Sequence, residues 1–362
     1  MKIIYSWGHN QKEKPFIKAE IKEWVDAGYD ITSINHREEL NIERAYSPEE
    51  LNDLYAKKDE NLFRLYEKIR NLSENHDVFM VNFENVYHPD FIKSLKKIYT
   101  VIISGDDPES SDFCSKPYVA AFDHSFAWGV NFDKNKKITE KFLEWGAKRA
   151  DFWPHGARKD MYDTRLTEKE IYNEERNIDL AFIGNPSNKA ERLLKIKKAF
   201  PEMKIYGQGW SWRAFIRSKI RINTFLAGFW WIKKIPPEKL VSLYQECKIG
   251  INIHMSYGPS NLRMYQLPAN GVMQICDCPE GLGQVFEIGK EVVTYYSVEE
   301  AIELIKYYLE HDEERKKIAA AGFKRTMKDY KRLVTFINAI EKIKKGIIAD
   351  DIKYFKDGTL IH

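Results

Sequence analysis

Residues 178–200, IDLAFIGNPSNKAERLLKIKKAF, decide the fold of this chain. An apolar run of strand length leads into a loop that contains Gly184, and the loop leads into a segment whose apolar residues recur at helical spacing. A similar alternation of strands and helices already fills the first half of the chain. The stretch therefore marks the start of a second α/β domain.

The alternation continues on the carboxyl-terminal side of this stretch. Apolar runs and helical periodicity predict further elements up to about residue 330. The predicted strands are 203–207, 248–253, 273–276 and 292–296, and the predicted helices are 237–247, 298–310 and 312–329.

The first half shows the same pattern from the amino terminus onward. Because βαβ crossovers are right-handed, strands connected by helices form a parallel sheet. We predict an α/β fold of two Rossmann-like, doubly wound parallel-sheet domains facing a cleft, which is the default place for a ligand. The predicted strands are 2–7, 29–35, 77–83, 99–104 and 118–122, and the predicted helices are 15–27, 48–72 and 88–97.

Composition excludes several classes of protein. The 362 residues contain 57 Lys and Arg against 54 Asp and Glu, and this net charge of +3 is too small to imply a polyanion partner without a local patch. The four cysteines have the spacing of neither a structural zinc site nor a disulfide framework, so we expect no metal. The amino terminus lacks the ~7–15 apolar residues of a signal peptide, which favours a cytoplasmic location.

Two loops have features of a phosphate site. In residues 257–271, YGPSNLRMYQLPANG, a loop of small residues turns into a predicted helix, and the amide groups at such a start attract phosphate. The loop within 182–194 combines Gly184 with Lys189 and Arg192. An ordinary capped helix and an ordinary βα turn explain these two patterns equally well.

Two acidic residues follow a first-domain strand. Asp106 and Asp107 come at the predicted carboxyl end of strand 99–104, where a parallel sheet presents its ligand groups. One carboxylate could act as a general base, since adjacent acids repel and one pKa rises. The alternative is an Asx-type turn before Pro108.

Residues 209–236 form a basic and aromatic insertion in the second domain. This composition suits a peripheral membrane contact beneath a lipid-linked substrate, and it equally suits a groove that binds nucleic acid. A helical hairpin packed on the domain is the third interpretation.

The second half resembles the carboxyl-terminal domain of GT-B glycosyltransferases, particularly the spore-maturation CgeB-type group. The resemblance lies in KLVSLYQECKIGINIH, GPSNLRMYQLPANGVMQICD and the run from GLGQVFEIGKEVVTYY to AAAGFKRT, in this order. The first half is similar through the strand leading into DDP and through FWPHGA. The implied division is an acceptor-side domain at 1–157, a linker at 158–176, a nucleotide-sugar-binding domain at 177–330, and a tail at 331–362 that crosses back to the first domain.

The resemblance also implies roles for individual residues. The family's Glu that binds the nucleotide ribose corresponds to Gln266, a departure that removes a charge, and a second family Glu corresponds to Gly258, which favours an inverting reaction. Similarity to phage β-glucosyltransferases maps the base onto Asp106, with Asp107 as the other choice. The candidate donor-binding residues are Gly8, Gly184, Asn185, Lys189, Arg192, Gly207, Ser260, Asn261, Leu262, Arg263 and Gln266.

Together these features predict a metal-independent glycosyltransferase that uses a nucleotide-sugar donor, most simply a UDP-sugar, and no other cofactor. The acceptor would be a hydroxyl of a polysaccharide, protein, lipid-linked glycan or modified DNA. Two alternatives remain open, a transferase that modifies hydroxymethylated DNA bases and a sugar-nucleotide-binding protein without catalysis.

Overall fold

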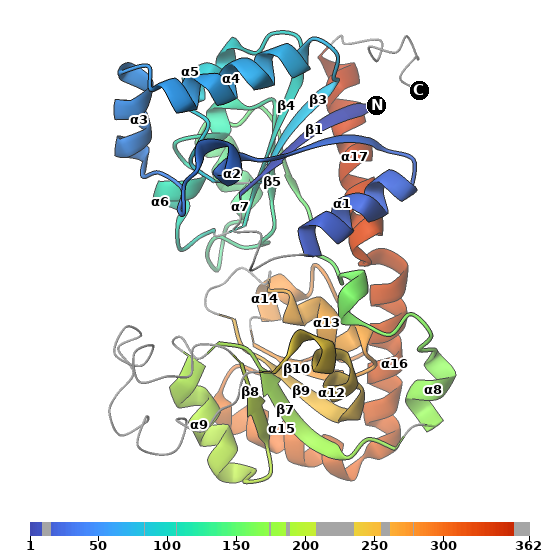
Figure 1. The fold of residues 1–362 in the computed structure, drawn as a ribbon. Helices are drawn as coiled ribbons and strands as arrows, with labels where there is room; N and C mark the ends of the chain where they lie inside the picture. Colours follow the sequence, from blue (N-terminus) through green and yellow to red (C-terminus); the bar gives the residue numbers. More distant parts are fainter. Residues whose placement is uncertain are drawn as a thin grey trace. The chain divides into compact units, whose positions relative to one another are not determined.

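The fold is known from a computed structural model, which describes residues 1–350 apart from 9–15, 83, 106, 174, 186–188, 208–234, 255–260 and 278. The chain divides into two compact units (Figure 1). Met1–Pro154 and the chain from Thr335 onward form the first unit, and His155–Val334 forms the second. The basic and aromatic insertion at 209–236 falls almost wholly outside the described residues, so its three interpretations stay open.

The first unit is built on a parallel sheet of six strands in the order β2-β1-β3-β4-β5-β6. Nearly all residues of the central strands β1, β3 and β4 are buried, as expected for a sheet covered on both faces. The strands are β1 Lys2–Trp7, β2 Asp30–Asn35, β3 Val78–Asn82, β4 Tyr99–Ser104, β5 His124–Ala127 and β6 Ala150–Phe152.

Helices of the first unit start and pack for identifiable reasons. Ser47 and Glu50 form a reciprocal capping box at the start of α3, and Asp59 caps α4. Phe336 of α17 stacks on Trp24 of α1 at 4.1 Å, which ties the last helix to the first unit. The helices are α1 Phe16–Asp26, α2 His36–Leu40, α3 Pro48–Ala56, α4 Glu60–Ser73, α5 Pro89–Ser94, α6 Ser111–Cys114, η1 Val119–Ala121, α7 Ile138–Glu144 and α17 Arg332–Ala349.

The second unit contains a parallel sheet of five strands in the order β11-β10-β9-β7-β8. One apolar cluster fills its interior and includes Phe182, Ile251 and Ile275. The strands are β7 Ile178–Ile183, β8 Lys204–Tyr206, β9 Cys247–Asn252, β10 Met273–Cys276 and β11 Val293–Thr294. The helices are η2 Lys159–Met161, α8 Glu168–Asn173, α9 Ala190–Ala199, η5 Pro237–Lys239, α12 Leu240–Glu246, α13 Arg263–Ala269, α14 Pro279–Leu282, α15 Val298–Glu310 and α16 Asp312–Asp329.

The predicted pair of doubly wound parallel-sheet domains is confirmed. The predicted strand at 118–122 is wrong, because Val119–Ala121 is a 3-10 turn and β5 begins only at His124. The predicted helix 48–72 is two helices, since Lys58 adopts a left-handed φ of 55° between α3 and α4. Of the helices that the structure describes, none combines the length and the apolar character needed to cross a bilayer.

Candidate functional site

The second unit brings a group of charged side chains to the carboxyl ends of its strands. The chain runs from β7 to β8 on one side and then returns to β9 on the other, so the strand order switches direction between β7 and β9. In open α/β sheets, ligands bind at such a switch point. Gly184 and Asn185 follow β7 there, and the Gly184 N–H donates to Tyr206 O at 2.8 Å, next to Gly207 at the end of β8.

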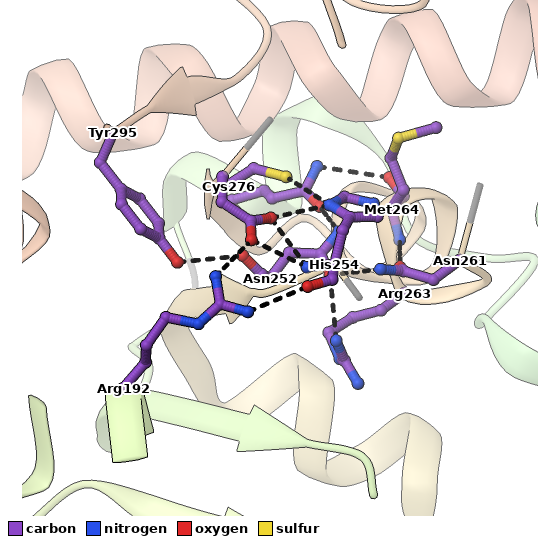
Figure 2. Close-up of polar contacts among 10 residues, drawn as sticks. Arg192, Asn252, His254, Asn261, Arg263, Met264, Cys276 and Tyr295 are labelled. Carbon is purple, nitrogen blue, oxygen red and sulfur yellow. Dashed lines mark hydrogen bonds and ion pairs between the residues drawn. The ribbon is translucent and has the colours of Figure 1, made fainter. Parts of the chain in front are cut away.

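Arg263 is held at the centre of this edge. It comes from the start of α13 and is buried, with 8% of its surface exposed. Its Nε donates to Ile183 O at 2.6 Å, and the guanidinium lies 4.3 Å from the ring centroid of Phe182. Its Nη1 donates to Asn252 Oδ1 at 3.0 Å (Figure 2). Burial lowers the pKa of Arg263, and among the described residues no carboxylate forms an ion pair with it.

Gly184 makes this placement of Arg263 possible. A Cβ atom at position 184 would overlap Nη2 of Arg263. The sequence predicted that this glycine admits close approach of a ligand, but here it gives room to the guanidinium. Gly184 therefore acts on the site through Arg263.

Arg192 is the second cation and is fixed from α9. Its Nη1 donates to Asp277 Oδ2 at 2.9 Å, and its Nη2 donates to the carbonyl oxygen of His254 at 3.0 Å (Figure 2). Asp277, directly after β10, also accepts from the backbone N–H of His254 at 2.8 Å. The ends of β9 and β10 and the helix α9 are thus joined by one partly buried ion pair.

Lys189 is the third cation, and it differs from the two arginines in its lack of hydrogen-bond partners among the described residues. It immediately precedes α9 and is buried, with 8% of its surface exposed. Its pKa is lowered to about 8, mainly by burial and in smaller part by Arg263 and Arg192, while Asp277 acts in the opposite direction. Within the described part of the chain, Lys189 forms no hydrogen bond or ion pair. Burying an amine without a hydrogen-bonded anion is costly in free energy.

Asn261 and Leu262, which were predicted to bind the donor, form hydrogen bonds with other residues of the protein. Asn261 Oδ1 accepts from Met264 N at 3.0 Å, and Asn261 Nδ2 donates to Asn252 Oδ1 at 2.8 Å. Leu262 accepts from Tyr265 N and Gln266 N through its carbonyl oxygen. Ser260 lies outside the described residues.

Gln266 faces the interior of the second unit. Its Nε2 contacts Met161 Sδ, its Oε1 accepts from the Tyr244 hydroxyl at 3.4 Å, and 7% of its surface is exposed. The predicted contact with a ribose stays a prediction.

In the first unit, Asp107 is held by hydroxyl groups. Ser104, Ser111 and Ser115 each donate to its carboxylate at 2.6–2.7 Å, and 4% of its surface is exposed. These bonds occupy both oxygens, which makes Asp107 a poor candidate for removing a proton from an acceptor. Asp106, the other predicted base, lies outside the described residues.

Gly8 also borders a closed network in the first unit. A Cβ atom at position 8 would overlap His36 Nε2 and Glu84 Oε2, which lie 3.0 Å apart. Glu84 is paired on its other side with Arg37 at 2.5 Å. The absence of a side chain at Gly8 leaves room for the contact between His36 and Glu84, and its predicted role in donor binding stays a prediction.

Sequence reasoning missed Asn252, His254 and Asp277. All three lie at or just beyond the ends of β9 and β10, and both strands were predicted. Polar residues at the carboxyl end of a predicted parallel strand are a signal that could have identified them.

His254, Cys276 and Asp277 are of metal-ligand type, and their ligand atoms all lie within 4.8 Å of one another. Asp277 is already engaged by Arg192 and by His254, so a cation would have to share this carboxylate with a guanidinium. That arrangement fits a hydrogen-bonded network better than a cation site. The prediction that no metal takes part is not tested by this geometry.

Comparison with known proteins finds a matching family for most of the second unit. Residues 188–337 match the family described as "Glycosyl transferase-like". The spore protein CgeB of Bacillus subtilis (strain 168) is 24% identical over 179 residues, which are 45% of this chain. The match spans 53% of the length of CgeB.

Solved structures match almost the whole chain. A glycosyltransferase from Rickettsia africae ESF-5 is 14% identical with a TM-score of 0.63, covering 96% of this chain and 98% of its own. Sucrose-phosphate synthase from Thermosynechococcus elongatus is 11% identical with a TM-score of 0.65, covering 96% and 100%. HepE from Anabaena, solved with UDP and glucose, is 10% identical with a TM-score of 0.60, covering 95% and 100%. The chain thus has the GT-B fold, residues 188–337 match the glycosyl transferase-like family, and somewhat less than half of the chain is similar to CgeB.

Proposed function

We propose that this protein is a glycosyltransferase that moves a sugar from a nucleotide-activated donor to a hydroxyl acceptor. The donor diphosphate would be bound at the β7/β9 switch point of the second unit by Lys189, Arg192 and Arg263. The similarity to HepE, which was solved with UDP and glucose, supports a UDP-sugar as the donor.

The single observation that carries this proposal is buried positive charge without a paired carboxylate. Lys189 and Arg263 are buried, and in the part of the chain that the structure describes the nearby carboxylate of Asp277 forms its ion pair with the half-buried Arg192 instead. Burying unpaired charge is costly, so proteins retain it where a ligand supplies the opposite charge. A diphosphate carries enough negative charge to balance the remaining cations.

This arrangement also suits the chemistry of sugar transfer. When the bond from the sugar to the diphosphate breaks, negative charge grows on the leaving phosphate oxygen. Cations that are already in place stabilise this charge without reorganising, and they act strongly where water is excluded. The proposal needs no bound metal for this step.

The acceptor side of the proposal rests on the first unit. Because the Asp107 carboxylate already accepts hydrogen bonds from three serine hydroxyls, we assign the general base to Asp106. Asp106 would remove the proton of the acceptor hydroxyl. Direct attack by that oxygen gives an inverted anomeric centre. The acceptor itself is a hydroxyl compound of unspecified class.

Calorimetric titration with UDP and UDP-glucose, followed by an assay for donor hydrolysis, tests the proposal. We expect both ligands to bind and the donor to be cleaved slowly even without acceptor. The Asp106→Asn variant should bind UDP normally but lose turnover. Tight binding with no turnover by either protein would favour a binding protein, and no binding of UDP at millimolar concentration would refute the donor site.

A further inference from the structure

His254 is a buried histidine beside the proposed diphosphate site, and sequence reasoning gave it no role. It follows the end of β9 and has 4% of its surface exposed. Its Nδ1 lies 2.8 Å from Asp277 Oδ1, and its backbone N–H donates to the same carboxylate (Figure 2). The ring is therefore anchored on one side only.

The partner of Nδ1 fixes where the ring carries its proton. Asp277 is paired with Arg192 at 2.9 Å, so its carboxylate is ionised and can only accept hydrogen bonds. Nδ1 must be the donor to Asp277. In an imidazole that carries its proton on Nδ1, Nε2 is a hydrogen-bond acceptor.

Nε2 has no partner in the described part of the chain, although it is fully buried. Buried polar atoms are nearly always hydrogen-bonded, and an orphaned one marks a group that takes its partner from a ligand or an ordered water. The partner of Nε2 must be a hydrogen-bond donor. Phosphate oxygens of a nucleotide sugar carry none at neutral pH, whereas its hydroxyl groups do.

We propose that Nε2 of His254 accepts a hydrogen bond from a hydroxyl of the transferred sugar, with Asp277 as the positioning residue that fixes the ring. This inference rests on the proposed function, because it assumes that a nucleotide sugar is the ligand. In this proposal Arg192 binds the diphosphate, and His254 forms a hydrogen bond with the sugar.

The His254→Asn variant gives the sharpest test. An asparagine amide can still donate to Asp277 from the position of Nδ1, but it has nothing at the position of Nε2. Loss of one buried hydrogen bond should weaken binding of UDP-glucose about 5–30-fold. Binding of UDP should change less than about twofold, because UDP lacks the sugar. Both affinities are measured by calorimetry, and urea unfolding checks that the variant folds.

Other outcomes overturn the inference in distinguishable ways. Equal weakening for UDP and UDP-glucose would place the hydroxyl on the ribose or mark a phosphate contact, and no change for either would mean a structural histidine. Stabilisation of the wild-type protein by Zn²⁺ alone, lost in His254→Asn, would make the ring a metal ligand. If the wild-type protein binds neither compound, the donor site itself is refuted together with the role of His254.

Discussion

The carboxyl edges of the two sheets have the same topology but differ in charge balance. In both units the first strand lies between the second and the third, as β2-β1-β3 and as β8-β7-β9. At the first edge, Glu84 is paired with Arg37 and His36, and the network is closed. At the second edge, Arg192 is paired with Asp277, whereas Lys189 and Arg263 form no ion pair with a carboxylate of the described residues.

This difference indicates that the first network serves stability and the second serves ligand binding. A network in which every charge has a partner contributes to folding and leaves nothing for a ligand. A network with buried charge left over costs stability until a ligand of opposite charge arrives. Topology placed both edges where ligands bind in this fold, and the side chains decide which of the two holds an anion.

The largest expected effect on stability comes from removing Glu84, the carboxylate of the paired network in the first unit. Replacing Glu84 by alanine leaves Arg37 and the buried His36 without their carboxylate, and we expect the free energy of unfolding to fall by about 3 kcal/mol. Urea unfolding measures this loss. UDP affinity should be unchanged, since Glu84 belongs to the first unit and the proposed donor site is built from residues of the second.

A matched control uses another glutamate of the first unit. Glu39 pairs with Lys68 on the surface, and their side chains are 36% and 47% exposed. Glu39→Ala should cost less than about 1 kcal/mol. If Glu84→Ala costs no more than this control, the closed network does not stabilise the first unit.

A smaller effect is expected from Gly184→Ala at the open edge. The added Cβ overlaps Nη2 of Arg263 and forces the guanidinium away from its site. We expect UDP affinity to fall about 30-fold, or about 2 kcal/mol, as for loss of a charge-assisted hydrogen bond. In an Arg263→Met background the same glycine substitution should have no further effect, and an additive loss would show that Gly184 acts independently of Arg263.

The smallest effect is a pH dependence of UDP binding. The pKa of Lys189 lies at about 8 in the free protein, so raising the pH from 7 to 9 removes the proton that makes it a cation. If bound diphosphate keeps Lys189 protonated, affinity should fall about tenfold over this range. Titrations of Lys189→Met at the same pH values control for ionisation of UDP, and an equal fall in this variant would argue against the role of Lys189.

Much of the fold was predictable because it depends on local patterns. Buried strands such as Ile178–Ile183 are short apolar runs followed by helical periodicity, and these signals survive without tertiary information. The strand at 118–122 was misassigned because Tyr118 and Val119 are buried in turn structure, and an apolar run alone does not distinguish the two. The β6 strand was missed since it has only three residues.

The site was predictable only in part. Lys189, Arg192 and Arg263 were identified as cations near two loops, but the burial of Lys189 and Arg263 and the pairing of Arg192 with Asp277 are tertiary properties. Asp277 and His254 are separated by 23 positions in the chain and meet only because β9 and β10 are neighbours. The role of Gly184 depends on Arg263, which is remote in sequence, so the loop pattern could not reveal it.

The most direct measurement of the central claim compares Lys189→Met with Lys198→Met, the same substitution on the exposed side of α9. For Lys189→Met we predict about 10–100-fold weaker UDP binding, together with an unfolding free energy at least equal to that of the wild type, because an unpaired buried charge is replaced by an apolar chain. Lys198→Met should alter neither quantity. Unchanged UDP binding by Lys189→Met would contradict the account, as would a loss of binding that only accompanies a loss of stability.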